Sequence, residues 1–341
     1  MKKLITAFTA LALIGSVAWA QDIRFTQLNS NPLRVNPALM APNYDLQFNL
    51  GYRTQWSTVG NGYNTAHFTY AMPVLMQDNG SKLDVGVTVL SDEAGAFSTF
   101  DGQLAVNYAL KLSPSGHFLS AAIMAGYNQN QLSTDGLTFG DQYSAVNGGA
   151  TLLSSEASIW ADPAKYVDVS AGLLWYFNPG KDSMPEAVSA FAGASVFHIN
   201  EPNAAPLSEG GAGRISKIPR RWTTIAGLKI YTQGKLDFAP QIRYDLQAGL
   251  REFSLGLYTG YTINEEMRAV LGIWYRDNQS FAFILGFNWK YFNLGYSYDL
   301  PSSNISAGLG NPSVHEITLG CKLDWASKKG VAFVKNPIDP Y

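Results

Sequence analysis

The feature that most constrains the fold of this chain is an alternation of apolar and other residues that persists for ten residues or more in separate segments. In residues 236–247, one face of an extended chain would carry Leu236, Phe238, Pro240, Ile242, Tyr244 and Leu246. The opposite face would carry Asp237, Ala239, Gln241, Arg243, Asp245 and Gln247. A period of two is typical of a β-strand, and about ten tilted residues are enough for a strand to cross a bilayer. The alternation therefore predicts strands with one face toward lipid.

Other segments repeat this pattern, and the composition fits lipid-facing strands. Similar faces recur in 83–89, 119–127, 167–175, 267–275, 281–289 and 292–298. Only 15% of the residues are charged, and the chain holds 18 Tyr, 18 Phe and 8 Trp, whereas a water-soluble domain usually carries about 25% charge. A large soluble β-sandwich would also alternate, but several of these faces are aliphatic or aromatic along their whole length. The sequence therefore favours an all-β protein whose strands cross a membrane as a barrel.

Counted along the chain, the segments predict a transmembrane antiparallel β-barrel of about fourteen strands. The predicted strands are 43–57, 62–74, 81–91, 96–111, 117–130, 165–177, 186–200, 219–232, 234–246, 249–262, 265–276, 279–289, 291–299 and 313–325. The three long connections, 131–164, 201–218 and 300–312, follow the fifth, seventh and thirteenth strands and so fall on one side of the membrane. This sorting predicts long extracellular loops and short periplasmic turns.

The segments outside the barrel complete the predicted organisation. Residues 1–20 combine Lys2 and Lys3 with an apolar run and the small residues Ala18 and Ala20, which predicts a signal peptide cleaved near Ala20 and export to the outer membrane. Residues 21–42 hold two asparagine–proline pairs, and proline disfavours a central strand. We expect an N-terminal periplasmic or plug segment there, a barrel over 43–325 and a periplasmic tail over 326–341.

The sequence holds no local signature of catalysis or of metal binding. Four histidines, His67, His117, His198 and His315, form no H-x-x-x-H pair, and no G-x-S-x-G motif occurs. After removal of the signal peptide, 22 basic residues face 26 acidic ones, so nucleic acid is not an expected partner. We expect a protein that is not an enzyme and that binds no cofactor or metal. A barrel hydrolase stays open as an alternative, because a Ser-His-acid set can assemble across strands.

Charged residues on the predicted inner faces are the most informative polar groups. They are Asp237, Arg243, Asp245, Arg268 and Arg276, all on neighbouring strands. Opposite charges on neighbouring strands can pair across the interior. These candidates form either a selectivity patch of a channel or a salt-bridged, water-filled interior, and the second interpretation is favoured.

Several short motifs resemble the PorP/SprF family of type IX secretion outer-membrane proteins in Bacteroidota. They are Gln21-Asp22 with Phe25-Thr26-Gln27, Asn31-Pro32-Leu33, Asn36-Pro37-Ala38, Tyr52-Arg53-Thr54-Gln55-Trp56, Pro219-Arg220-Arg221-Trp222, Tyr296-Ser297-Tyr298-Asp299 and His315-Glu316-Ile317. The resemblance singles out Asn31, Pro32, Asn36, Pro37, Arg53, Trp56, His315 and Glu316 as structural or plug residues. Two departures are Cys321, where an aromatic residue is usual, and a long tail beyond Trp325.

The resemblance implies a barrel that accompanies export of large surface proteins such as gliding adhesins. In that role it would receive or retain the C-terminal signal domain of a secreted protein, beside other secretion components and the lipid of the membrane. Loops held on a rigid barrel are suited to such binding. The alternatives are a channel or porin for small or hydrophobic solutes and, less favoured, a barrel hydrolase. A plug in the lumen would distinguish a binding scaffold from an open channel.

Overall fold

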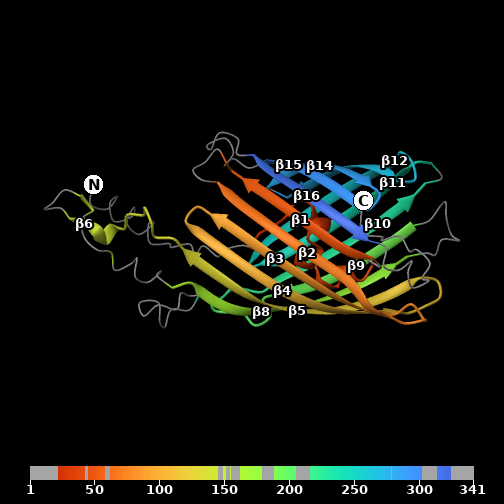
Figure 1. The fold of residues 1–341 in the computed structure, drawn as a ribbon, viewed down its shortest axis with the longest axis horizontal. Coiled ribbons are helices and arrows are strands. Elements are labelled where there is room, and N and C mark those ends of the chain that lie inside the picture. The colour runs from red at the N-terminus through yellow and green to blue at the C-terminus, as the bar shows by residue number, and fades with distance from the viewer. Residues whose placement is uncertain are drawn as a thin grey trace, which may run out of the picture.

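The structure is a closed antiparallel β-barrel of fourteen strands (Figure 1). This computed structural model describes residues 22–42, 45–57, 62–144, 149–150, 154, 162–178, 188–204, 216–232, 234–277, 279–301 and 313–323. The predicted signal peptide, the predicted tail and parts of the long loops lie outside the described residues. The predicted fold class is confirmed, and each barrel strand ends within three residues of the predicted bounds.

The strands follow one another around the wall in chain order. They are β1 (Leu46–Gln55), β2 (Tyr63–Met76), β3 (Lys82–Ala94), β4 (Phe97–Lys111), β5 (His117–Leu132), β8 (Ala164–Phe177), β9 (Val188–Phe197), β10 (Arg221–Tyr231), β11 (Leu236–Gln247), β12 (Leu250–Thr262), β13 (Met267–Arg276), β14 (Ser280–Trp289), β15 (Phe292–Pro301) and β16 (Val314–Leu323). Pairing of β1 with β16 closes the ring. The sequence did not predict β6 (Tyr143–Ser144) and β7 (Gly149–Ala150), which form a separate two-stranded ribbon.

The wall has the polarity of a membrane barrel. On β4, Leu104 and Val106 are 66% and 52% exposed, whereas Gln103 and Asn107, which flank them in the sequence, are buried. The same arrangement, with apolar side chains outside, holds on β11 and β13, where Ile242 and Leu271 point outward. Large apolar side chains on the outside and polar ones inside suit acyl chains outside and a polar interior. Among the described residues, no helix has the length and hydropathy to cross a bilayer.

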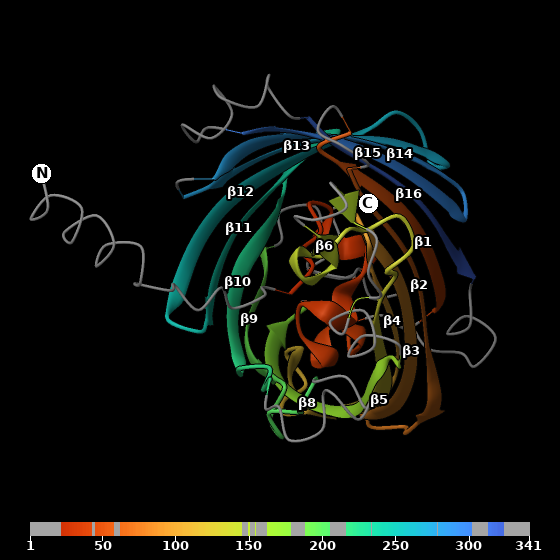
Figure 2. The ribbon, with the colours of Figure 1, turned by 90° about the vertical axis from the view of Figure 1, so that its left-hand side faces the viewer.

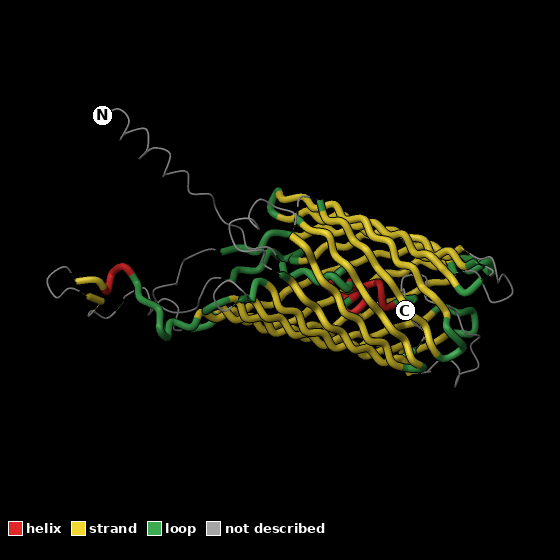
Figure 3. Tube along the Cα trace, turned by 90° about the horizontal axis from the view of Figure 1, so that it is seen from above, coloured by secondary structure: helices red, strands yellow, loops and turns green. Residues whose placement is uncertain are grey.

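The two ends of the barrel differ. At the terminal end, where β1 begins and β16 ends, short turns such as 112–116 join the strands. At the loop end, the long connections leave after β5, β9 and β15, as the sequence predicted. The connection after β5 carries the 3₁₀ turn η4 (Gly140–Gln142) and the β6–β7 ribbon, which extend beyond the wall (Figures 1 and 3).

Residues 22–42 occupy the lumen, and we call them the plug. Figure 2 shows this segment in red, surrounded by the wall strands. It contains three 3₁₀ turns, η1 (Leu28–Ser30), η2 (Pro32–Arg34) and η3 (Pro37–Met40). Asp22 contacts residues at the loop end, namely His198 after β9 and Arg221 at the start of β10. Ala41 contacts Tyr176 near the end of β8, so the plug runs from the loop end to the terminal end.

Candidate functional site

The plug is bonded to the wall on every side. Hydrogen bonds or ion pairs join it to twelve strands: β1 through Arg53, β2 through Thr69, β3 through Thr88, β4 through Asp101, β8 through Leu173, β9 through Ser195, β10 through Arg221, β11 through Gln247, β12 through Glu252, β13 through Arg276, β15 through Asp299 and β16 through Glu316. The other two strands, β5 and β14, add Phe118 and Ile284 to apolar clusters that include plug residues. The lumen is therefore filled by a fitted segment.

Asp22 forms a charged latch at the loop end. Its carboxylate lies 2.9 Å from His198 Nε2 and 2.7 Å from Arg221 Nη1, and it accepts a hydrogen bond from Gln247 Nε2 at 3.0 Å. The other ring nitrogen of His198 lies 3.0 Å from Asp168 on β8. His198 has a left-handed backbone (φ 56°), which is uncommon for a residue other than glycine. The ring thus joins the plug to two strands.

Electrostatics keep this latch charged at neutral pH. Burial disfavours the charged ring, but the carboxylates of Asp22 and Asp168 outweigh burial and raise the pKa of His198 to about 9. Burial also opposes ionisation of Asp22, but the Arg221 guanidinium and His198 hold the pKa of this carboxyl well below its usual range. Each charge on the latch therefore stabilises the other.

A second charged cluster surrounds Thr26. Thr26 Oγ1 donates to the carboxylate of Asp299 at 2.8 Å and accepts from Arg53 and Arg276 at 2.8 and 2.9 Å. Arg276 Nη1 also lies 2.7 Å from Asp299 Oδ2, and Arg53 Nη1 lies 3.1 Å from Glu316 Oε2. Buried charges persist only when they are paired and hydrogen-bonded. Here a plug hydroxyl lies at the centre of the pairing.

The two asparagine–proline pairs each start a 3₁₀ turn. Pro32 and Pro37 occupy the first positions of η2 and η3, where proline's missing N–H is not needed. Asn36 Oδ1 caps η3 by accepting from Ala38 N at 2.9 Å, and its Nδ2 donates to the carbonyls of Leu173 and Ala194. A Cβ at Gly172 would lie 2.0 Å from Asn36 Oδ1. Glycine at 172 is therefore required for this close approach.

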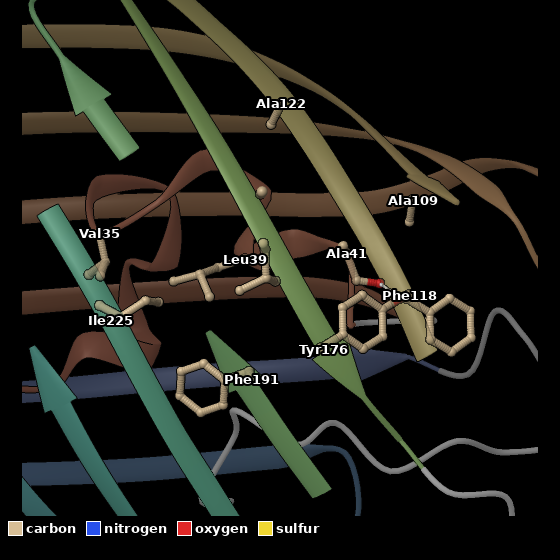
Figure 4. Packing of buried hydrophobic residues seen from close by; sticks show 11 residues of the cluster. Val35, Leu39, Ala41, Ala109, Phe118, Ala122, Tyr176, Phe191 and Ile225 are labelled. Atoms are coloured by element: carbon tan, nitrogen blue, oxygen red, sulfur yellow. Dashed lines mark hydrogen bonds between the residues drawn. The ribbon is translucent and has the colours of Figure 1, made fainter. Parts of the chain in front are cut away.

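The inner part of the plug is held by apolar packing. Val35, Ala38, Leu39 and Ala41 lie in one buried cluster with side chains from β4, β5, β8, β9 and β10 (Figure 4). The rings of Phe118 and Tyr176 stack at 4.7 Å in this cluster, and Tyr176 donates to the carbonyl of Ala41. Leu33 and Met40 lie in a second cluster with Ala71, Ala105, Met124 and Phe197. Two cavities between plug and wall, one beside Leu28 and Trp274 and one beside Arg24 and Glu252, each have a volume of about 10 Å³, room for about one water.

The inward charges predicted from the sequence lie in ion pairs. Arg268 pairs with Asp237 between β13 and β11, and Arg243 Nε lies 2.6 Å from Asp245 Oδ2 on the same face of β11. Arg276 lies in the Thr26 cluster. All five predicted inward charges therefore lie in ion pairs, and their role, as a selectivity patch or as a salt-bridged, water-filled interior, stays a prediction.

The family-motif residues divide between lumen and rim. Asn31, Pro32, Asn36 and Pro37 belong to the plug, and Arg53 and Glu316 are its buried partners. Two others lie away from the plug. Trp56 follows β1 and packs on Tyr63 with ring centroids 5.4 Å apart, and His315 bonds to Tyr296 on the outer face. The functional roles of all these residues remain predictions.

Sequence reasoning missed the plug's own charges and several of their partners. Arg24 pairs with Glu252, and Arg34 pairs with Asp101 at 2.6 Å. Asp22, His198 and Asp299 were not singled out as site residues either. Alternation on β4 and β12 places Asp101 and Glu252 inward, so it could have marked them. The plug itself has no sequence periodicity, so the sequence alone could not show which wall residues Arg24 and Arg34 contact.

The described residues offer little support for catalysis. They contain no group of three or more His, Cys, Asp or Glu side chains that could hold a metal ion. Ser30 Oγ lies 3.4 Å from His67 Nε2, but His67 Nδ1 has no hydrogen-bond partner. A serine–histidine pair without an orienting carboxylate lacks one part of a hydrolytic triad.

The wall, its polarity and the filled lumen define a plugged outer-membrane β-barrel. Three similar solved structures are the toluene transporter TbuX of Ralstonia pickettii (TM-score 0.52, 10% identity, covering 86% of this chain and 93% of that one), a TodX deltaS2S3 mutant monoaromatic hydrocarbon channel (0.51, 11%, 86% and 94%) and a Pseudomonas aeruginosa FadL homologue (0.50, 10%, 85% and 93%). At these identities the similarity shows the fold alone. No curated protein matches the chain.

The family is shown by sequence. The model of the type IX secretion system membrane protein family PorP/SprF matches residues 17–321. The chain therefore belongs to the PorP/SprF family and is an outer-membrane protein of type IX secretion. The resemblance inferred from the motifs is confirmed.

Proposed function

We propose that this barrel receives or retains a secreted surface protein at its loop end, through the C-terminal domain of that protein. Membership in a type IX secretion family supports a role in protein export. The observation that carries the proposal is the plug, which is bonded to twelve strands and packed against the other two. A wall whose interior is filled in this way is suited to hold loops in fixed positions.

The loop end offers the surface for such a partner. The long connections all leave at this end, and the described part of the one after β5 extends beyond the wall (Figure 1). Its described part includes the exposed side chains of Leu137 and Tyr143. Exposed apolar residues on a projecting segment are typical of protein contacts. We therefore expect the connection after β5 to contribute to partner binding.

The test compares two loop replacements in cells that lack the chromosomal gene. In one variant a four-residue turn replaces residues 133–162 at the loop end. In the control, a turn replaces residues 179–186 at the terminal end. We expect surface adhesins to be lost with the first variant and kept with the second, when both barrels are folded and equally abundant. Normal surface display in the complete deletion strain would overturn the proposal.

The alternative function is a channel for small or hydrophobic solutes. The similar solved structures that are named as a toluene transporter and a hydrocarbon channel share this fold. Planar-bilayer conductance separates the two functions. A binding scaffold predicts little conductance for the intact chain, in which residues 22–42 fill the lumen. Steady conductance or solute uptake with the plug in place would favour the channel.

We also propose that the protein is not an enzyme. This proposal rests on the secretion family and on the Ser30–His67 geometry, in which no carboxylate orients the histidine. Hydrolysis of a generic ester by the purified barrel, abolished by a serine-reactive probe, would contradict it.

A further inference from the structure

The junction between β1 and β16 is the one place in the barrel where two paired strands are not joined to each other by a single connection of the chain. Every other pair of neighbouring strands is consecutive in the barrel order, whereas β1 and β16 come from opposite ends of it. Bringing distant segments together costs more chain entropy than forming a hairpin. Contacts specific to the β1–β16 seam therefore have a larger role in closure than similar contacts elsewhere.

One ion pair marks the native register of this seam. Ten residue pairs join β1 to β16, and Arg53 lies directly opposite Glu316. Arg53 Nη1 lies 3.1 Å from Glu316 Oε2, and both residues are buried. A slip of two residues would keep both side chains inside but place Arg53 opposite Val314 or Thr318. That slip would leave two buried charges without each other, which is costly.

The plug contributes more bonds to the Glu316 carboxylate than β1 does. The backbone N–H groups of Thr26 and Gln27 donate to the two carboxylate oxygens of Glu316 at 2.8 and 3.0 Å. Gln27 Nε2 donates to the backbone carbonyl of Glu316, and Gln27 Oε1 accepts from Thr318 Oγ1 at 2.7 Å. Two adjacent plug residues thus hold two positions of β16.

The same two residues also reach β1. Arg53 Nη1 donates to Thr26 Oγ1 at 2.8 Å, so the guanidinium is shared between the plug and Glu316. The following turn, η1, lies against both β1 and β16. Two strands from opposite ends of the chain and one plug segment therefore meet at a single buried cluster.

We propose that Thr26 and Gln27 form a staple across the β1–β16 seam, so that the first and last strands join in native register only together with the plug in the lumen. The Glu316 carboxylate can be fully hydrogen-bonded only when both the plug and β1 are present. Closure without the plug would bury this carboxylate with Arg53 alone. Plug insertion and barrel closure are thus one coupled step. This role is independent of the partner that the loops bind.

The plug offers a matched control for this proposal. Gln27 and Asn31 are both buried amides of the plug. Gln27 bonds to β16 at the seam, whereas Asn31 Oδ1 accepts from Thr69 on β2 and Thr88 on β3, two strands joined by a turn. A plug that only fills space would make Gln27→Ala and Asn31→Ala equivalent. A staple makes them different.

The first measurement is hydrogen exchange of the folded chain in lipid nanodiscs. We expect Gln27→Ala to speed exchange of the amides shared by β1 and β16 by about tenfold or more, and Asn31→Ala to leave that seam unchanged. Equal effects of the two variants on the seam, or a uniform rise over all strands, would overturn the proposal. If Gln27→Ala does not fold, Thr318→Val removes one bond to Gln27 from the wall side and should give a smaller rise confined to the same seam.

A cross-link supplies the second measurement. Phe48 lies opposite the natural Cys321 across the seam, and partner residues of antiparallel strands lie within the range that a disulfide can bridge. In the double variant Gln27→Ala with Phe48→Cys, oxidation would form a disulfide between position 48 and Cys321. We expect this cross-link to return hydrogen exchange of the β1–β16 amides to the wild-type rate. Exchange that stays fast despite a complete cross-link would overturn the proposal.

Discussion

The two halves of the plug are held in the lumen by different forces. Residues 22–31 are fixed by charged and hydrogen-bonded contacts, among them Asp22 with Arg221 and Thr26 with Asp299. Residues 32–42 lie mostly in apolar clusters, with Leu39 and Met40 buried. Charged contacts depend on pH and on exact partners, whereas apolar packing depends on shape and volume. We therefore call residues 22–31 the outer half, whose specific polar contacts fix where the plug lies in the lumen. We call residues 32–42 the inner half, whose apolar packing holds the plug in place.

The largest effect is expected from a charge placed in the inner half. Leu39→Asp would leave a carboxylate without a partner beside Phe191 and Ile225. We expect the opening free energy of residues 32–42, measured by hydrogen exchange, to fall by about 4 kcal/mol or more. Leu39→Met keeps the apolar volume and should cost less than about 1.5 kcal/mol. Wild-type protection in Leu39→Asp would show that packing does not anchor this half.

A rise in pH should loosen the outer half alone. The pKa of His198 is raised to about 9, so its contribution is complete below about pH 6.5 and is lost as the pH rises through 9. We expect the opening free energy of residues 22–31 to fall by about 3 kcal/mol between pH 6 and 10, with 32–42 little changed. His198→Gln should remove this dependence, and its persistence in that variant would assign it to another group.

A smaller effect is expected where the wall accommodates the Asn36 side chain. Gly172→Ala would place a methyl group against Asn36 Oδ1 and displace an amide that bonds to two strand carbonyls. We expect a loss of about 2 kcal/mol in the opening free energy of residues 32–42. At Gly102, where an added Cβ would lie 3.7 Å from Phe100, the same substitution should be nearly neutral. Equal effects at both glycines would contradict the close approach.

The smallest effect is expected at Val35, in the inner half of the plug. Ser195 Oγ donates to the carbonyl of Val35 at 2.8 Å, and Ser195→Ala should cost about 1 kcal/mol in the same exchange measurement. The control lies on the same strand, where Ser189 Oγ is buried without a hydrogen-bond partner. Ser189→Ala should change the opening free energy little, and a larger loss at Ser189 than at Ser195 would be inconsistent with the Val35 contact.

The wall could be predicted from the sequence because its code is local. The residues of each strand show which face is apolar and which is polar, as Leu104 and Gln103 do on β4. A period of two over such a length indicates a β-strand. Loop lengths then sorted the connections between the two ends. The β6–β7 ribbon was missed because two-residue strands carry no measurable period.

The lumen contacts could be predicted only in part. The alternation marked Arg243 and Arg276 as inward, and the motifs marked Asn36 and Glu316. Neither signal could show that Glu316 contacts Thr26 and Gln27, which lie about 290 residues away in a segment without periodicity. Proline argued against a strand in residues 21–42 but carried no information on depth or direction. Such contacts depend on the closed ring, which no single segment encodes.

The direction of the plug changes the count of passes across the membrane. Fourteen strands alone would leave both ends of the chain at the same face, but residues 22–42 add a fifteenth pass from the loop end to the terminal end. Asp22 and Leu323 therefore lie at opposite faces. We expect an epitope joined ahead of Asp22 and one joined after Leu323 to be accessible from opposite sides of the membrane.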